Sequence, residues 1–260
     1  ATGRMSSSDP NLQNIPRDSS VRSLFVAPDD HPLLVADYDQ IELRVMAMFS
    51  QDKELLHVFN NDIDIHTGAA ALLFGKHVDD VTSEERQIGK GVNFLTAYGG
   101  GAGKLARTTG IEFEQAQKMI QEYYRQFSGL TEWKQQVVAT GRRQGYVTTI
   151  SGRRRRLPDL MSSDSEARAR AERQAVNAVV QGSAADICKQ AMIDIHKTLE
   201  GTGAHMLVQV HDELVVSVPD TVLDDIVEPF LTAMGDGRVI NGVPIKVSYH
   251  HAMNWSEAKG

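Results

Sequence analysis

The sequence is poor in the residue types that mark special classes of protein. Of its 260 residues only Cys188 is a cysteine, and 8 are proline. A single cysteine excludes an internal disulfide and is typical of a reducing compartment. The sequence also lacks a signal-peptide pattern and any apolar run of about 18 residues, the length that crosses a membrane. We therefore expect a soluble, cytoplasmic protein.

Basic residues are outnumbered by acidic ones. There are 27 Lys and Arg against 34 Asp and Glu, which gives a net charge of −7. This balance disfavours a broad surface for polyanions, so a polyanionic partner would need a local basic groove. The apolar fraction of 41% and the charged fraction of 23% are those of an ordinary globular protein, with either one large domain or two modest ones.

The stretch from Thr82 to Tyr98 predicts a helix with an unusual row of side chains. Thr82 followed by Glu85 is a capping-box pattern, which marks the start of a helix. Every fourth residue then belongs to one row about 18 Å long. The members of this row are Arg86, Lys90, Phe94 and Tyr98. Its length and polarity match a nucleoside triphosphate, because the cations would bind phosphates and the rings would contact sugar and base.

This helix is poorly optimised for stability. Arg86 and Lys90 lie near the N-terminus, where each cation opposes the helix dipole by about 0.3–1 kcal/mol. Gly89 and Gly91 each cost about 1 kcal/mol relative to alanine. Such residues indicate selection for function. The alternative is an amphipathic surface helix whose rings face the core, and the spacing alone favours that alternative.

The remaining pattern predicts a mixed α+β chain that begins with a polar, looped segment. Strands are expected at 31–37, 204–210, 214–218 and 243–249, and a β-hairpin at 146–158. Helices are expected at 40–49, 52–60, 64–75, 112–126, 130–143, 165–199 and 220–233. The glycine-rich stretch 99–103 is interpreted as a hinge or turn, because no strand precedes it and no Gly-Lys-Ser/Thr follows it. The basic cluster 153–156 is either a solvated turn or a phosphate contact.

The long helix predicted at 165–199 carries one polar line. Arg173, Asn177 and Gln181 recur at four-residue spacing among small residues. A polar line is usually the solvated face of a helix. Small neighbours would also let another backbone or a duplex approach closely, so both interpretations remain open.

Carboxylates are expected at the ends of strands. Asp37 follows the first apolar run, and Asp212 and Glu213 form the tip of the predicted hairpin. Carboxylates that crowd a turn repel one another, which indicates a cation there. Mg²⁺ is often held by one or two carboxylates together with substrate phosphates, and a pair of ions about 3.5–4 Å apart performs phosphoryl and nucleotidyl transfer. Spacing alone does not show that Asp37 and Asp212 meet.

Five ordered motifs carry a resemblance. TGRMSSSDPNLQNIP, VADYDQIELRV, ERQIGKGVNF with a following YG, RQAVNAVVQGSAAD and QVHDELV resemble the polymerase region of family A DNA polymerases, the group of bacterial DNA polymerase I. The resemblance implies an α+β fold with an antiparallel palm sheet at 1–60 and 146–260 and a helical fingers subdomain at 61–145. It implies template-directed addition of deoxynucleotides to a primer 3′ end with release of pyrophosphate. The expected location is the nucleoid in the cytoplasm, with a phage-infected cell or an organelle as alternatives.

The resemblance also implies roles for individual residues. Asp37, the Tyr38 carbonyl and Asp212 would hold two Mg²⁺ ions, or Mn²⁺ as a substitute, with Glu213 as a more peripheral carboxylate. Lys90 would donate a proton to the leaving pyrophosphate, and Glu42 would exclude a ribose 2′-hydroxyl. The residues expected at the deoxynucleoside triphosphate are Arg86, Lys90, Phe94, Tyr98, Glu42, His66 and Gln40. The residues expected at primer-template DNA are Arg4, Gln13, Asn14, Arg173, Asn177, Gln181 and His211.

The sequence departs from the family pattern around two of these motifs. The departures are Leu95 and Thr96 after Phe94, Gly89 and Gly91 where alanine is common, and Asp39 in place of the usual serine. They are expected to change closure of the fingers and nucleotide discrimination, while leaving the chemistry intact.

Two expectations concern what the chain does not contain. A helical thumb and any proofreading or 5′-nuclease domain would lie upstream, in the same or a companion polypeptide, and DNA binding without a thumb should be weak and salt-sensitive.

Two other functions remain open: a catalytically silent DNA-binding fragment, and a metal-dependent phosphohydrolase. Binding alone would not need Asp37, Lys90 or Asp212, and a phosphohydrolase would leave the ring row unexplained.

Overall fold

The structure is a computed structural model that describes residues 2–16 and 18–259, so Ala1 and Gly260, the ends of the predicted palm segments, lie outside the described residues. The chain has the expected mixed α+β class and divides into two compact units. Unit 1 combines Ala1–Ile41, Gln181–Val239 and Pro244–Gly260, and unit 2 combines Glu42–Val180 with Ile240–Val243. No described helix has the length and apolar character needed to cross a membrane.

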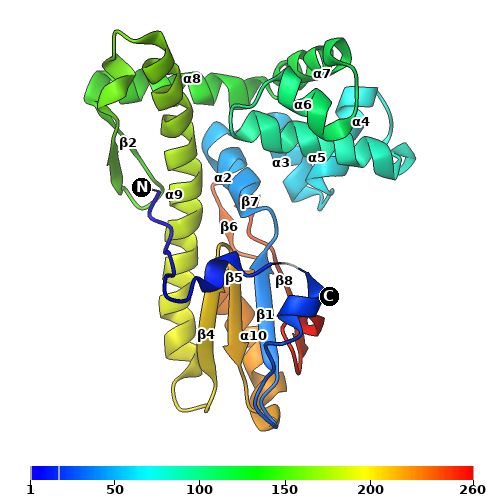
Figure 1. The fold of residues 1–260 in the computed structure, drawn as a ribbon, viewed down its shortest axis with the longest axis vertical. Coiled ribbons are helices and arrows are strands. Elements are labelled where there is room, and N and C mark those ends of the chain that lie inside the picture. Colours follow the sequence, from blue (N-terminus) through cyan, green and yellow to red (C-terminus); the bar gives the residue numbers. More distant parts are fainter. Residues whose placement is uncertain (1, 17, 260) are drawn as a thin grey trace. The chain divides into compact units, whose positions relative to one another are not determined.

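Unit 1 is built on a four-stranded antiparallel sheet (Figure 1). Its strand order is β4 (His205–Val210), β5 (Glu213–Ser217), β1 (Leu33–Tyr38) and β8 (Val247–Ala252). The apolar run of β1 is therefore central, with a partner strand on each side. This position explains why four consecutive residues of β1 are all buried, as expected for a strand covered on both faces.

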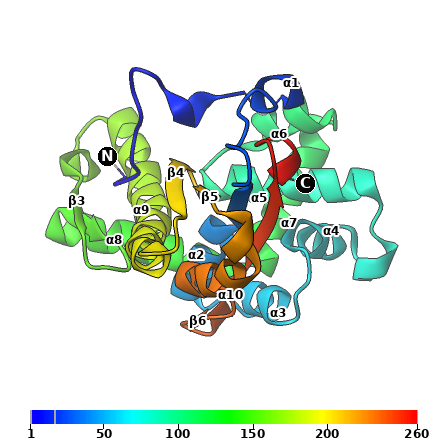
Figure 2. The same cartoon turned by 90° about the horizontal axis from the view of Figure 1, so that it is seen from below.

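The two faces of the sheet are covered by different elements. Successive side chains of a strand alternate, so Leu33, Val35 and Asp37 share one face of β1. On that face Leu33 and Val35 belong to a cluster with Trp255 and Ala258. On the opposite face the Tyr38 hydroxyl donates to the Met234 carbonyl over 2.7 Å. Met234 ends α10 (Leu223–Met234), which lies against this face in Figures 1 and 2.

Shorter elements complete unit 1. They are η1 (Leu12–Asn14), α1 (Ser19–Arg22), η4 (Asp220–Val222) and η5 (Glu257–Lys259). The two-stranded pair β6 (Val239–Ile240) and β7 (Val243–Pro244) lies where the chain passes between the units.

Unit 2 is mainly helical. Its helices are α2 (Ile41–Ser50), α3 (Lys53–Asn60), α4 (Ile65–Phe74), α5 (Ser83–Ala97), α6 (Ala102–Thr109), α7 (Phe113–Gln126) and α8 (Ser128–Gln144). The single turn η2 (Val78–Asp80) lies between α4 and α5. The hairpin of β2 (Tyr146–Thr148) and β3 (Arg154–Arg156) and the turn η3 (Pro158–Met161) follow α8. The helix α9 (Ser165–Leu199) is continuous, and its residues are divided between the units after Val180. The predicted helix at 165–199 is thus confirmed.

The predicted start of α5 is confirmed in detail. The Thr82 side chain accepts from the Glu85 N–H, and the Glu85 side chain accepts from the Thr82 N–H. Both bonds satisfy donors that the first helical turn leaves without intrahelical partners. This reciprocal cap offsets part of the cost of the cations that follow it.

Close helix packing explains the glycines of α5. A Cβ atom on Gly89 would lie 2.4 Å from the His66 carbonyl oxygen, which is sterically impossible. A Cβ on Gly91 would lie 3.1 Å from Thr109 Cγ2 on α6. Glycine at these positions lets α5 approach α4 on one side and α6 on the other. Packing therefore accounts for Gly89 without a functional argument.

Three local expectations are wrong. The glycine-rich stretch is a turn only up to Gly101, because Ala102 and Gly103 already belong to α6, which the pattern does not predict. The strand expected at 243–249 is divided into β7 and β8, because Pro244 has no N–H to donate and Ile245 donates instead to Arg238. Glu213 is not at the hairpin tip but is the first residue of β5.

Candidate functional site

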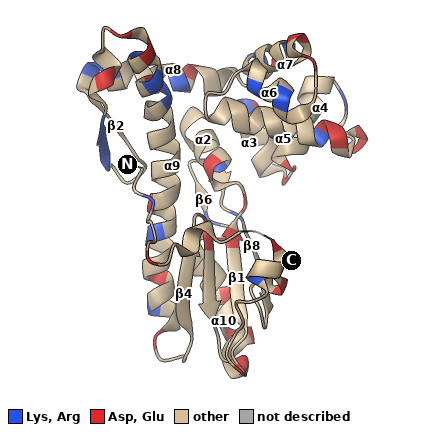
Figure 3. Ribbon diagram, in the orientation of Figure 1, with Lys and Arg blue, Asp and Glu red and all other residues tan. Residues whose placement is uncertain are grey.

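The two predicted metal-binding carboxylates come together in unit 1. Asp37 lies at the end of β1, and Asp212 lies in the two-residue turn between β4 and β5. The Tyr38 N–H donates to the Asp212 carbonyl over 3.3 Å, so the backbones of the two sites touch. Burial and the charge of Asp212 raise the pKa of Asp37 to about 6. Acidic residues gather where β1 ends and β5 begins (Figure 3).

The oxygen atoms of Asp37 suit a divalent cation. Oδ1 is buried and has no hydrogen-bond partner among residues 2–16 and 18–259, which is costly for a carboxylate. Within the described ranges, no three His, Cys, Asp or Glu side chains converge as a metal site. A hard cation bound here would therefore take the two carboxylates and fill its shell with carbonyl, water and phosphate oxygens, which is how Mg²⁺ is commonly held.

Glu213 has a different environment from these two aspartates. It is 2% exposed and pairs across the sheet with Asp37. The Trp255 indole N–H donates to its Oε1 over 2.9 Å, and Arg22 Nη1 lies 3.6 Å from the same oxygen. Lys259 Nζ donates to its Oε2. Protein groups thus already engage both oxygens, and the cation expected beside Glu213 is supplied by the chain itself.

Lys259 and Arg22 are functional candidates that sequence reasoning missed. Lys259 lies in η5 and bridges Glu213 and Asp37, with 3.4 Å between its Nζ and Asp37 Oδ2. Arg22 is 3% exposed and lies over the Trp255 ring, 4.6 Å from its centroid. A single lysine or arginine in a polar stretch carries no pattern that links it to a distant strand, so no sequence signal could have found them.

The cationic end of the α5 row is partly neutralised within unit 2. Arg86 donates through Nε and Nη2 to the two oxygens of Asp64, each over 3.0 Å. Asp64 is the N-cap of α4 and also accepts from the Thr67 N–H. Although burial acts to raise it, these hydrogen bonds hold the pKa of Asp64 below its usual value. Three of the five guanidinium N–H donors remain for another acceptor.

The rest of the row faces a cavity. Lys90, Phe94 and Tyr98 line a cavity of about 750 Å³ between α5 and α6, together with Lys104. In the described part of the chain, no carboxylate forms an ion pair with Lys90. The rings of Phe94 and Tyr98 are nearly parallel, 6.4 Å apart, and 47% and 36% exposed. The alternative of rings packed into the core is therefore wrong.

Glu42 and Tyr98 are in direct contact. The Tyr98 hydroxyl donates to Glu42 Oε2, which joins the start of α2 to the end of α5. The contact joins Glu42, which is expected to exclude a ribose 2′-hydroxyl, to Tyr98, the last ring of the row expected at the nucleotide. Gln40, just before α2, has a positive φ of 51° that ends β1 sharply.

His66 is buried between α4 and α5. It is 5% exposed, its ring lies 5.8 Å from that of Phe94, and Nδ1 is 3.2 Å from the Asn93 amide. Burial lowers the pKa of His66; the charge of Asp64 opposes this shift, and the charges of Arg86 and Lys90 add to it. The neutral ring is therefore favoured, and it packs beside Phe94.

The expected DNA-binding residues are distributed over both units. In unit 1 the Gln13 amide donates to the Gln209 carbonyl over 3.3 Å, and the Gln209 amide donates to the His211 carbonyl. Gln13 and His211 are thus linked through one residue, Gln209, and a positive φ of 60° at His211 lies in the hairpin turn. Arg4 and Asn14 are exposed in the N-terminal segment, and Gln181 lies on α9.

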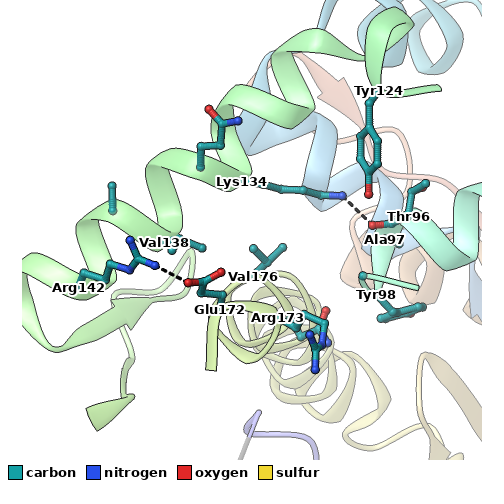
Figure 4. A pocket seen from close by; sticks show the side chains of 14 residues that line it. Thr96, Ala97, Tyr98, Tyr124, Lys134, Val138, Arg142, Glu172, Arg173 and Val176 are labelled. Carbon is teal, nitrogen blue, oxygen red and sulfur yellow. Dashed lines mark hydrogen bonds and ion pairs between the residues drawn. The ribbon is translucent and has the colours of Figure 1, made fainter. Parts of the chain in front are cut away.

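A second cavity of unit 2 contains Arg173 and Asn177. It measures about 420 Å³ and lies between the end of α5, α8 and the first part of α9 (Figure 4). Arg142 pairs with Glu172 at its edge, and the Lys134 ammonium points to the end of α5. The basic residues of β3 are separate from this cavity, and Arg154 lies over the Tyr146 ring at 4.8 Å.

Comparison with known proteins agrees with this geometry. Residues 1–257 match the family described as DNA polymerase family A. The chain belongs to DNA polymerase family A. Its structure is similar to that of the POL domain of Pol1 from M. smegmatis in complex with DNA primer-template and dNTP, with a TM-score of 0.94 and 39% identity. That similarity covers 100% of this chain and 47% of the other chain.

Curated family A relatives are similar over the whole length of this chain. The DNA polymerase I of Pseudomonas aeruginosa is 41% identical over 264 residues, covering 99% of this chain and 29% of the relative. The thermostable DNA polymerase I of Thermus filiformis is 43% identical over 263 residues, covering 100% and 32%. The chain therefore spans about a third of the length of these relatives, and it corresponds to part of a family A polymerase domain.

Proposed function

We propose that this chain is the palm and fingers part of a template-directed DNA polymerase. It would add deoxynucleotides to a primer 3′ end and release pyrophosphate. The observation that carries the proposal is the convergence of Asp37 and Asp212, with an unpaired buried oxygen on Asp37, in a chain of DNA polymerase family A. The M. smegmatis relative, solved with primer-template and dNTP, supports the assignment of these substrates.

Asp37, Asp212 and the Tyr38 carbonyl would hold the metal ions. Two bound Mg²⁺ ions, or Mn²⁺ as a substitute, would supply activation of the primer hydroxyl and stabilisation of charge at phosphorus. Glu213, expected as the more peripheral carboxylate, would act as a positioning residue that holds Lys259 and Trp255 beside Asp37.

The α5 side chains would bind the incoming nucleotide. Lys90 is an exposed ammonium without an ion-pair partner in the described chain, and it would bind the triphosphate and give a proton to pyrophosphate. Arg86 would bind a phosphate with the donors that Asp64 leaves open. Phe94 would pack on the sugar, supported by His66. Glu42, held by Tyr98, would exclude a ribose 2′-hydroxyl. Gln40 would be a further contact of the nucleotide.

The domain assignment remains part of this proposal. The palm would comprise 1–60 and 146–260, and the fingers 61–145. Primer-template DNA would contact Arg4, Gln13, Asn14, Arg173, Asn177, Gln181 and His211. A thumb and an exonuclease domain would be supplied by further regions of the same or a companion polypeptide, which agrees with the share of the relatives that this chain spans.

The decisive experiment is primer extension with a matched pair of variants. Asp212→Asn removes one carboxylate from the site, and Asp225→Asn makes the same change at an exposed position of α10. We expect template-dependent extension by the wild type and Asp225→Asn at low salt and high protein concentration, and none by Asp212→Asn. DNA binding without extension by any of the three would support a silent fragment. Release of phosphate without a template would support a phosphohydrolase.

A further inference from the structure

One lysine of unit 2 has an environment that the proposed polymerase chemistry does not use. Lys134 on α8 is half-buried, and its Nζ donates to the Thr96 carbonyl over 2.7 Å (Figure 4). The same Nζ lies 5.6 Å from the centroid of the Tyr124 ring. Thr96 is in the last turn of α5, where carbonyls lack intrahelical partners and a cation is favourable. Lys134 therefore ties α8 to the end of α5.

No anion neutralises this ammonium in the described chain. Glu172 lines the same cavity, but its Oε1 pairs with Arg142. The other titratable groups facing the cavity are Tyr124, Tyr98 and Arg173, which carry no negative charge near neutral pH. Burial therefore dominates, and it lowers the pKa of Lys134 to about 8. A much larger share of this amine is then neutral near neutral pH than of a fully solvated lysine amine.

The cavity gives a small reagent access to this amine. Its volume of about 420 Å³ is in the range of small-molecule sites. Arg173 lines it with positive charge, whereas the charge of Arg142 is paired with Glu172. The stem of Arg173 covers Gly99, where a Cβ would lie 2.8 Å from Arg173 Cδ. An anionic reagent would be attracted to this opening, and the neutral amine would be the nucleophile that it meets.

We propose that Lys134 is an acylation site for acyl phosphates or acyl thioesters that enter this cavity. The neutral Nζ attacks the acyl carbonyl carbon and forms an amide bond. The bond from that carbon to phosphate oxygen or thiol sulfur breaks, and the leaving group takes the electron pair. The proton lost by Nζ goes to phosphate or to the thiolate, so no oxidant or further reactant is needed.

Acylation would loosen the end of α5. The amide product has no charge, so it loses the attraction to the helix C-terminus and to the Tyr124 ring. Tyr98 and Gly99 donate to the Phe94 and Thr96 carbonyls in the turn that Lys134 supports. The modification would therefore act on the position of Tyr98 at the end of the nucleotide row. The site itself does not depend on the proposed function.

The test is site-resolved mass spectrometry after exposure to acetyl phosphate in one arm and acetyl-CoA in the other. Lys118, exposed on the neighbouring α7, is the internal comparison. At pH 7.5 we expect Lys134 to be acetylated about 10-fold faster than Lys118, because its larger neutral fraction outweighs its lower basicity and restricted access. Its rate should rise with pH, reach half of its maximum near pH 8, and level off about one pH unit higher.

Further readouts separate the site from a general effect of lysine chemistry. Lys134→Arg keeps the cation and should leave the acetylation of Lys118 unchanged. Hydrogen exchange at Tyr98 and Gly99 should become faster in the acetylated wild type and stay slow in treated Lys134→Arg. Labelling in only the acetyl phosphate arm would identify acyl phosphates as the source. Acetylation of Lys134 no faster than that of Lys118 in both arms would overturn the proposal, whatever the polymerase activity.

Discussion

The two units hold their charged groups in opposite ways. In unit 1 the carboxylates Asp37 and Glu213 are paired with Lys259 and Arg22 in a largely buried network. In unit 2 the row on α5 is largely exposed, and of its two cations only Arg86 forms an ion pair with a carboxylate in the described part. Burial makes the charges around Glu213 expensive to leave unpaired, whereas solvent screens the cations of the α5 row. The same residue types are therefore structural in one unit and available for ligands in the other.

The largest expected effect distinguishes a functional carboxylate from a structural one. Asp37→Asn should reduce primer extension by about 1,000-fold, because it removes a metal-binding charge. The raised pKa means that the charged form destabilises the folded state, so the wild type should lose stability as the pH rises from about 4 through 6. The Asp37→Asn variant should not show this loss of stability. Urea denaturation at pH 4.5 and pH 8 measures this difference, which should favour the variant at pH 8.

The size of that stability difference is limited by exposure. The Asp37 side chain is 37% exposed, so solvent screening reduces the effect to about 1 kcal/mol. A variant less stable than the wild type at pH 8 would show that Asp37, too, is structural, and would remove the contrast with Glu213.

Glu213→Ala tests the structural half of the comparison. It leaves Arg22, Lys259 and the Trp255 indole without their acceptor, and breaking a buried ion pair costs about 3 kcal/mol or more. We expect this loss in the free energy of unfolding, measured in urea. Glu257→Ala makes the same change at an exposed position of η5 and should cost less than about 0.5 kcal/mol. Equal stability of the two variants would contradict the network described here.

Gly89→Ala tests packing against function within unit 2. Alanine favours a helix by about 1 kcal/mol over glycine, yet its Cβ would lie 2.4 Å from the His66 carbonyl oxygen. We expect a net loss of about 2 kcal/mol in stability, since α4 and α5 must separate. Gly103→Ala, inside α6, is the matched control, because a Cβ there would meet only Phe113 Cε2, at 3.9 Å. A Gly89→Ala protein more stable than the wild type would contradict the packing explanation and would indicate that glycine is present at position 89 for function.

Lys259→Met gives the smallest expected effect. The Lys259 ammonium competes with a divalent cation for Asp37, so its removal should tighten Mn²⁺ binding about 10-fold. Mn²⁺ binding by electron paramagnetic resonance at low ionic strength measures this without any need for catalysis. Lys197→Met removes an exposed lysine of α9 and should leave the affinity unchanged. Weaker Mn²⁺ binding by Lys259→Met would show that Lys259 instead organises the metal site.

Local patterns predicted the elements and several of their ends. The capping box at Thr82 and Glu85 was sufficient for the start of α5, because its hydrogen bonds join residues three apart. The apolar run of β1 and the Ala-rich pattern of α9 were equally readable. The pattern failed at α6, where Gly103 is a weak helix former, and at Pro244, which interrupts the last predicted strand.

The sequence by itself determined the family, because the five family motifs occur in it in order as short continuous segments. It also determined the periodicity of each helix and strand. It also supplied Asp37 and Asp212 as candidates without showing that they meet. Tertiary structure decided that β1 pairs with β5, that Lys259 and Arg22 surround Glu213, and that Lys134 reaches the end of α5. Periodicity reports which face of an element is apolar, whereas only the pairing of distant elements determines which charge meets which.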